Sequence, residues 1–129
     1  MKAKRFNKGK VEFNDLPLLA LAEVGKVGVV GRAKYDKYNW KKGAPVTQYI
    51  DCAQRHLIKY MYGEDLDKET KCHHFAHAAW NCLAALEQII TGNEDDDRYK
   101  DYKDLDVSKL FELNDDQKEV VKKLLEKKK

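Results

Sequence analysis

The sequence predicts an all-α fold, a small helical bundle of three core helices followed by a C-terminal amphipathic helix. Apolar residues recur at spacings of three and four along separate stretches, which is the period of one face of a helix. The alternation of apolar and polar residues that marks a half-buried strand is nearly absent. At 129 residues the chain is long enough for one domain with a core, so we expect a single domain over residues 1–129.

The N-terminal residues predict an exposed arm and then the first core helix. Residues 1–15 are polar and basic, and they offer little beyond Val11 and Phe13 to bury, so we expect a basic arm that frays. An apolar pattern then runs from Pro17 to about Lys34, and proline is favoured in the first turn of a helix. Three glycines within it indicate either a bend or the close approach of another backbone or a ligand; they are Gly25, Gly28 and Gly31.

A second helix is predicted from Pro45 until Gly63 stops it. Its apolar positions recur every three or four residues; they are Val46, Tyr49, Ile50, Ala53, Leu57, Ile58 and Met61. Asp51 and Arg55 lie one turn apart on this helix. Their pairing is either a surface salt bridge or a contact that orients Arg55 toward a bound phosphate.

The third helix, from about Glu69 to Ile90, is apolar on most sides and should therefore lie in the middle of the bundle. We expect Asp67 or Thr70 to cap its first turn. This helix completes a predicted core over residues 16–91, which also carries the polar residues of interest.

Beyond Gly92, residues 92–107 predict an acidic linker, and residues 108–129 predict the C-terminal helix. Asn114 followed three residues later by Gln117 is the arrangement of a capping box at the start of that helix. The helix either closes the bundle or pairs with a second chain.

Composition narrows the classes of protein. The charged fraction of 36% exceeds the usual quarter, and no run of about 18 apolar residues exists to span a bilayer. The basic N-terminus is not followed by an apolar signal segment. Three cysteines, an odd number, fit reduced thiols in the cytoplasm better than a disulfide framework.

Charge is unevenly distributed along the chain. Residues 1–42 hold eleven Lys and Arg against four Asp and Glu, whereas residues 94–106 hold seven acids against three bases. The basic segment either attracts the phosphates of a nucleotide or a nucleic acid, or forms an ordinary solvated surface.

Chemically active side chains concentrate between residues 55 and 81, a stretch that contains all four histidines. Such a collection suits acid–base chemistry, metal binding or phosphate binding. The loop within it is either fully solvated or neutralised by a cation, because it places four carboxylates in six positions. These carboxylates belong to Glu64, Asp65, Asp67 and Glu69.

Aromatic and basic residues alternate in a second stretch, residues 32–43. Tyr35 and Trp40 can stack on a base while lysines such as Lys34 hold phosphates. The alternative is that these rings plug the end of the helical core.

Several short elements, in order and with matching gaps, resemble a small, mainly viral family, the dATP/dGTP diphosphohydrolase N-terminal domain-like proteins. The resemblance covers roughly residues 16 to 90. The elements are Lys34-Tyr35, Asn39-Trp40, Arg55-His56-Leu57, Gly63-Glu64-Asp65-x-Asp67-x-Glu69, His74-x-x-His77-Ala78 and Asn81. The resemblance to this family implies an all-helical phage protein that handles purine deoxynucleotides and hydrolyses the triphosphate to monophosphate and pyrophosphate.

Two other families of phosphohydrolases are distinguished by motifs that are absent here. The chain carries neither the Glu-Glu-x-x-Glu helix of MazG-type enzymes nor an adjacent His-Asp pair.

The first functional hypothesis is a nucleotide phosphohydrolase that depends on Mg²⁺ or Mn²⁺. We expect the metal ligands to be Glu64, Asp65 and Asp67, and the catalytic residues to be His56, His74 and His77. The expected substrate-binding residues are Lys34, Tyr35, Asn39, Trp40, Arg55, Lys59 and Asn81.

The second hypothesis is a protein that binds a nucleotide or a cyclic-nucleotide signal without breaking it, in the manner of an anti-defence sponge. A third, a nucleic-acid binder using residues 1–42, lacks any recognised nucleic-acid motif. We expect a homo-oligomer, because the helices that carry the site are few and apolar. We expect its location to be the host-cell cytoplasm.

Overall fold

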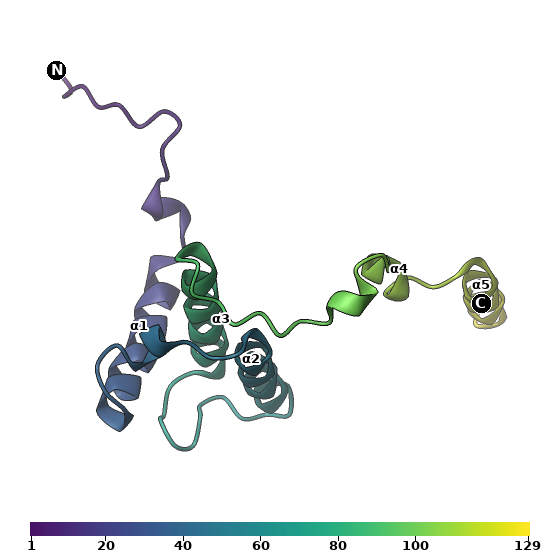
Figure 1. Ribbon diagram of the computed structural model, residues 1–129. Helices are drawn as coiled ribbons and strands as arrows, with labels where there is room; N and C mark the ends of the chain where they lie inside the picture. Colours follow the sequence, from purple (N-terminus) through teal and green to yellow (C-terminus); the bar gives the residue numbers. More distant parts are fainter. The chain divides into compact units, whose positions relative to one another are not determined.

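The computed structural model describes all residues from 1 to 129, and they form helices joined by turns and loops (Figure 1). This confirms the predicted all-α class. The chain divides into two compact units, Met1–Arg98 and Tyr99–Lys129. The organisation of residues 1–129 as one domain stays a prediction.

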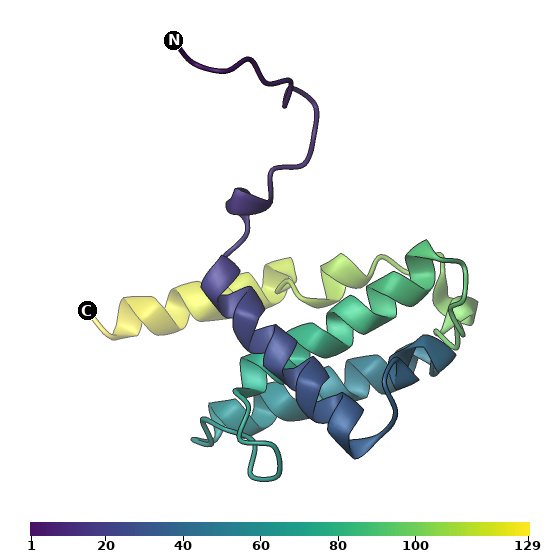
Figure 2. The ribbon, with the colours of Figure 1, turned by 90° about the vertical axis from the view of Figure 1, so that its left-hand side faces the viewer.

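Three helices form the first unit, and the third lies between the other two (Figures 1 and 2). They are α1 (Leu18–Lys34), α2 (Val46–Met61) and α3 (His74–Ile90). The helix α2 runs alongside α3 in the opposite direction, whereas α1 crosses α3 at a steep angle (Figure 2). Lys34, at the end of α1, forms an ion pair of 2.6 Å with Glu69, just before α3 begins. The central position of α3 confirms the expectation drawn from its apolar faces.

Small side chains let the helices approach closely. Ala53 on α2 is buried, as are Ala76, Ala78 and Ala84 on α3. On α1, a Cβ added to Gly28 would lie 3.5 Å from Trp80 Nε1, whereas the other two glycines of this helix face open space. A Cβ at this distance makes an ordinary van der Waals contact, so the packing of α1 on α3 does not require glycine at position 28.

The start of α3 differs from the prediction. The expectation that the helix begins near Glu69 was wrong, as was its capping by Asp67 or Thr70. The helix begins at His74, and its N-cap is His73, whose Nδ1 accepts a hydrogen bond of 3.1 Å from the backbone of Phe75. The preceding residues are held in a separate loop by their own hydrogen bonds.

The opposite end of the bundle is fixed by Gln88, which is buried on α3. Its Nε2 donates to the carbonyl oxygen of Trp40 at 3.0 Å, and its Oε1 accepts from Nδ2 of Asn93 at 2.6 Å. Trp40 lies in a short 3-10 helix, η2 (Asn39–Lys42). The turn before α2 is thereby attached to the C-terminal end of α3.

The acidic segment after α3 contacts the beginning of α2. Asp97 accepts hydrogen bonds from the backbone and the hydroxyl of Thr47, and the backbone of Val46 donates to the carbonyl oxygen of Asp95 at 2.9 Å. Carboxylates are favourable at a helix N-terminus. The first residues of the predicted acidic linker therefore serve as a cap for α2.

The arm before α1 is exposed throughout, and it contains one turn of 3-10 helix, η1 (Phe13–Asp15). In Figures 1 and 2 this arm runs away from the helices of its own unit. This agrees with the prediction of an arm that does not pack.

The second unit contains η3 (Lys100–Tyr102), α4 (Val107–Leu110) and α5 (Asp115–Lys127). The predicted capping box is confirmed, because Asn114 Oδ1 accepts from the backbone of Gln117 at 2.8 Å and Gln117 Oε1 accepts from the backbone of Asn114 at 2.9 Å.

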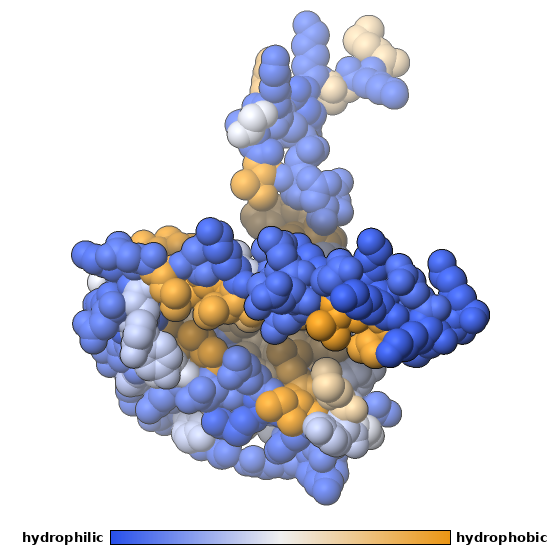
Figure 3. Space-filling model, turned by 90° about the vertical axis from the view of Figure 1, so that its right-hand side faces the viewer, coloured by the Kyte–Doolittle hydropathy of each residue, from blue (hydrophilic) through white to orange (hydrophobic).

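Most of the surface in Figure 3 is hydrophilic, with separate hydrophobic patches. None of the helices combines the length and the apolar character that a membrane span requires.

Replacement of Gln88 by alanine should lower the free energy of unfolding by about 1–3 kcal/mol, because the side-chain hydrogen bonds to the carbonyl of Trp40 and to Nδ2 of Asn93 are both lost. Urea denaturation of the Gln88→Ala variant measures the loss. The matched control is Gln54→Ala on the exposed face of α2, which should change stability by less than about 0.5 kcal/mol. Equal effects of the two substitutions would show that the Gln88 contacts do not stabilise the fold.

Candidate functional site

Three of the four histidines meet where α2 ends and α3 begins. His56 lies in the second half of α2, and His74 and His77 occupy the first turn of α3. Nδ1 of His56 lies 2.9 Å from Nδ1 of His74, and the rings of His56 and His77 stack with centroids 4.3 Å apart. The antiparallel packing of α2 on α3 brings these rings together.

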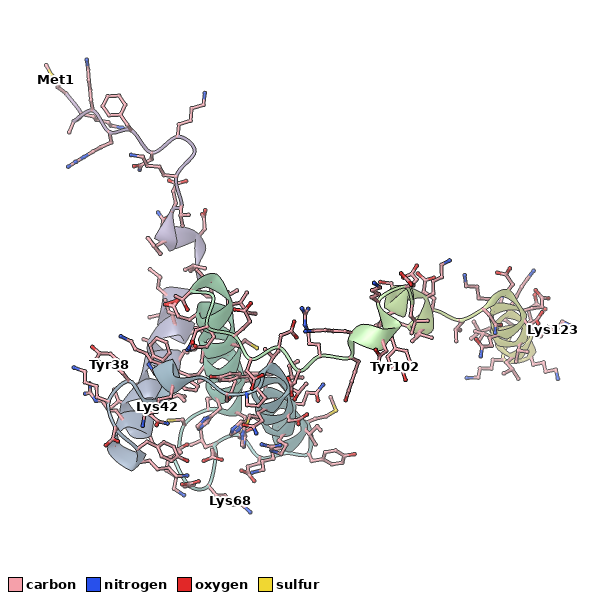
Figure 4. All side chains as sticks on the ribbon, viewed as in Figure 1. Met1, Tyr38, Lys42, Lys68, Tyr102 and Lys123 are labelled. Atoms are coloured by element: carbon pink, nitrogen blue, oxygen red, sulfur yellow. The ribbon has the colours of Figure 1, made fainter.

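The loop between the two helices folds back on itself. The backbone of Asp67 donates to the carbonyl of Cys72 at 2.9 Å, and the backbone of Lys71 donates to the carbonyl of Asp67 at 2.8 Å. Lys71 takes a left-handed conformation with φ of 64°. Lys68, at the tip of this loop, is exposed (Figure 4). The turn directs one acidic side chain, that of Asp67, inward.

Asp67 is 8% exposed, and its Oδ2 accepts two hydrogen bonds of 2.9 Å from the backbone and the hydroxyl of Thr70. Burial alone would raise the pKa of Asp67, but the hydrogen bonds from Thr70 outweigh it and hold the pKa below its ordinary value. Asp67 is therefore a carboxylate at neutral pH, with Oδ1 left for another partner.

His74 is fully buried and is bonded at both ring nitrogens. Nε2 lies 3.0 Å from Oε1 of Glu64, and a carboxylate only accepts, so Nε2 carries the proton. In neutral His74, Nδ1 is then the acceptor, and it receives a hydrogen bond from Nδ1 of His56. Glu64 thus decides which nitrogen of His74 faces the cluster.

A chain of hydrogen bonds through Thr70 also determines which ring nitrogen of His77 carries the proton. The hydroxyl of Thr70 donates to Asp67, so it accepts from Nε2 of His77 at 2.7 Å. Neutral His77 therefore keeps Nδ1 without a proton. Asn81, predicted to bind substrate, donates to the backbone carbonyl of His77 at 2.9 Å, which is a contact within the helix.

Burial favours the neutral form of two histidines, His56 and His77. Burial and, to a smaller extent, the neighbouring rings of His77 and His74 together lower the pKa of His56 to about 4. Burial also lowers the pKa of His77, although the charge of Asp67 opposes the shift. Neutral imidazoles are the form that binds metal ions.

The residues able to hold a metal ion are His56, Asp67 and His74, whose ligand atoms all lie within 4.8 Å of one another. Two imidazoles and one carboxylate form a donor set that fits a divalent cation. The chemistry of the residues present therefore agrees with the divalent metal expected from the sequence.

The three carboxylates predicted as metal ligands take different positions. Asp67 joins the histidines, whereas Glu64 is hydrogen-bonded to His74 and is partly buried. The side chain of Asp65 is exposed, and this residue contributes its backbone carbonyl to the amide of His74 at 3.4 Å. The structure groups Asp67 with His56 and His74 instead of with its neighbours in sequence.

Both lysines predicted to bind substrate, Lys34 and Lys59, lie near the cluster. The charge of Lys59 acts on both His56 and His77 and lowers the pKa of each. Lys34 reaches the loop through its ion pair with Glu69. Arg55 contacts Cys52 Sγ at 3.0 Å, beside a shallow depression that Asp51 also lines.

The predicted aromatic contacts lie elsewhere. Asn39 and Trp40 belong to η2, which is attached to Gln88 at the other end of α3. Fourteen residues separate Gln88 from His74, which corresponds to about 21 Å along a helix. Trp40 and Trp80 line an apolar groove instead. Nζ of Lys41 lies 4.1 Å from the ring centroid of Tyr38, which is labelled in Figure 4. Tyr35 is exposed.

Thr70 is the site residue whose role the sequence did not reveal. Its hydroxyl joins Asp67 to His77. The signal for this contact is the Asp-x-x-Thr spacing, because an aspartate commonly accepts from the backbone a few residues further along a turn.

The fold and the site together define a small all-α protein built around a cluster of histidines and a carboxylate. Residues 1–98 match the family described as dATP/dGTP diphosphohydrolase, N-terminal, and the chain belongs to this family. The matched residues coincide with the first compact unit.

A relative from Salmonella phage PMBT28, named dATP/dGTP diphosphohydrolase, is 30% identical to the chain over 94 residues. The aligned part covers 73% of this chain but 32% of the relative, so the chain spans about a third of that protein's length. No solved structure matches the chain.

In the metal-free protein, the free energy of unfolding should fall as the pH is lowered from about 6.5 to about 4. The upper limit is the ordinary pKa of histidine, and the lower limit is the pKa of His56 in the folded chain. The unfolded chain binds a proton in this interval that the folded chain excludes, so protonation favours unfolding. Urea denaturation across this range, with chelator present, measures the slope. The His56→Gln variant should show a smaller slope, and an unchanged slope would contradict the assignment.

Proposed function

We propose that this chain is a purine deoxynucleoside triphosphate phosphohydrolase domain that works with a divalent metal ion. The observation that supports it is the grouping of His56, Asp67 and His74 beside Lys59, in a chain of the dATP/dGTP diphosphohydrolase family. A bound cation would offset the negative charge of the phosphates.

The residues around the cluster supply positive charge and a proton acceptor. Lys59, and Lys34 at the loop, attract the phosphates. His77 accepts a proton at Nδ1, because Thr70 holds its Nε2 proton in place. An anionic substrate beside these rings raises their pKa values toward neutrality and improves them as bases.

The second candidate is a protein that binds a nucleotide without hydrolysing it. The observation that favours this alternative is that Asp67 alone among the loop carboxylates belongs to the group able to hold a metal ion, so the cluster offers few oxygen ligands to a catalytic Mg²⁺. The same lysines and histidines would hold the ligand.

Incubation of the purified chain with dATP or dGTP and Mg²⁺ or Mn²⁺ should release the monophosphate and pyrophosphate, which chromatography separates. His77→Gln should lower kcat by about 10²–10⁴-fold, the usual contribution of a positioned acid or base. Gln54→Ala is the control and should retain full activity. Retention of nucleotide without any product would establish the binding alternative, and the absence of both would contradict the proposal.

We also infer that a second copy of this chain covers the groove between α1 and α3. The buried core of the first unit consists mainly of valine and alanine, whereas larger apolar side chains line this open groove of about 470 Å³. They include Leu21, Trp40, Trp80, Leu83 and Ile90. A self-complementary apolar face is the usual basis of a symmetric dimer.

Light scattering after size exclusion should therefore give twice the mass of 15.0 kDa. Leu83→Glu should give a monomer that keeps its helical circular dichroism, because Leu83 is 47% exposed in the single chain. A monomeric parent protein at all concentrations would contradict the dimer. We also propose the host-cell cytoplasm as the location of this activity, which the odd number of cysteines and a nucleotide substrate support.

A further inference from the structure

We propose that His56, Asp67 and His74 bind one divalent first-row transition ion, such as Mn²⁺ or Co²⁺, in preference to Mg²⁺, and that Glu64 orients His74 for this ion. The inference deepens the proposed function, because it names the class of cation and its ligands at the same site. It replaces the set of three loop carboxylates expected from the sequence.

The donor atoms argue for a transition ion. Mg²⁺ prefers oxygen ligands and keeps much of its water, whereas imidazole nitrogen suits first-row transition ions. Two of the three groups gathered here are imidazoles, those of His56 and His74. The single carboxylate, Asp67, suits Mn²⁺ and similar ions as a third ligand.

The separation of the two imidazole nitrogens agrees with this assignment. Nδ1 of His56 and Nδ1 of His74 lie 2.9 Å apart. Two ligands on neighbouring corners of an octahedron lie about 3 Å apart when each bond is about 2.1 Å. Binding therefore needs little movement of the rings. His56 exchanges its proton on Nδ1 for one on Nε2 and remains neutral.

Glu64 prepares His74 for this role. Its Oε1 accepts the Nε2 proton of His74 at 3.0 Å, so Nδ1 is the nitrogen left for the ion. Because His74 is fully buried, its ring cannot turn to exchange the two nitrogens without breaking the packing. Histidine ligands generally donate their other N–H to a carboxylate or carbonyl, and loss of that partner weakens metal binding.

Asp67 is prepared in the same manner by Thr70. Both hydrogen bonds from Thr70 go to Oδ2, which leaves Oδ1 for the ion. The hydroxyl of Thr70 also accepts from His77, so the orientation of Asp67 is linked to the stacked histidine. Asp65 has no such support, because its side chain is exposed and lies outside the cluster.

The test is titration of the metal-free full chain with Mn²⁺, without nucleotide, followed by the loss of the electron paramagnetic resonance signal of free Mn²⁺. We expect one bound ion per chain, retained against about a hundredfold excess of Mg²⁺. Co²⁺ should compete with Mn²⁺ for the same site. Displacement by an equal concentration of Mg²⁺ would overturn the proposal.

Four variants test the ligand assignment. Glu64→Gln should weaken Mn²⁺ binding by about 10–100-fold, the usual effect of losing the carboxylate partner of a histidine ligand. His56→Gln should abolish binding, whereas Asp65→Asn should leave it unchanged. Glu12→Gln, in the exposed arm, controls for the loss of a negative charge. Abolition by Asp65→Asn, or full binding by His56→Gln, would overturn the assignment.

Circular dichroism shows whether each variant is folded. If Glu64→Gln unfolds, Glu64→Asp provides the second measurement: it keeps the charge but shortens the reach to His74, and it should bind Mn²⁺ more weakly than the parent protein. Equal affinities would overturn the role of Glu64.

The Mn²⁺-binding experiments can be read without any measurement of nucleotide hydrolysis. Mn²⁺ binding with these variant effects but without hydrolysis would support the metal site and contradict the proposed function. Hydrolysis that depends on Mg²⁺ and survives His56→Gln would support the function and contradict the metal site.

Discussion

The burial of the His74 imidazole is the constraint on which the site depends. A fully buried ring with two polar nitrogens needs a partner at each, and a lost partner costs about 1–3 kcal/mol. Glu64 and His56 are those partners, one from the loop and one from α2. The bonds therefore fix the position of α2 along α3 and the path of the loop at the same time.

Close helix packing makes this arrangement possible. The buried alanines Ala53 and Ala78 leave α2 and α3 near enough for His56 to reach His74. The loop is also ordered by its backbone, through the bonds that join Asp67 to Lys71 and Cys72. Three site residues thus lie on helices and one on a tightly bonded turn, which limits the movement of the ligand atoms relative to one another.

The periodicity of the sequence was sufficient to predict the three helices and the central place of the third, because these follow from local apolar patterns. The capping box at Asn114 was also predictable, because it depends only on Asn114 and on Gln117 three residues later. The start of α3 was not, because the hydrogen bonds of the loop compete with helix formation between Glu69 and His73.

The concentration of histidines between residues 55 and 81 includes the side chains that the structure brings together around His74. Sequence spacing did not reveal that His56 meets His74 across two helices, nor that Asp67 turns inward while Asp65 stays exposed. Those facts depend on helix register and on the turn at Lys71. Trp40 was expected near the same ligand, but the bond from Gln88 holds it at the other end of the bundle.

The most direct test of the account is a crystal structure of the chain grown with Mn²⁺ and a non-hydrolysable dGTP analogue, with data collected at the manganese absorption edge. We expect one anomalous peak bonded to His56, Asp67 and His74, with the phosphates of the analogue beside it and toward Lys59. A peak held by Asp65, or an intact hydrogen bond between His56 and His74 with no metal between them, would contradict it.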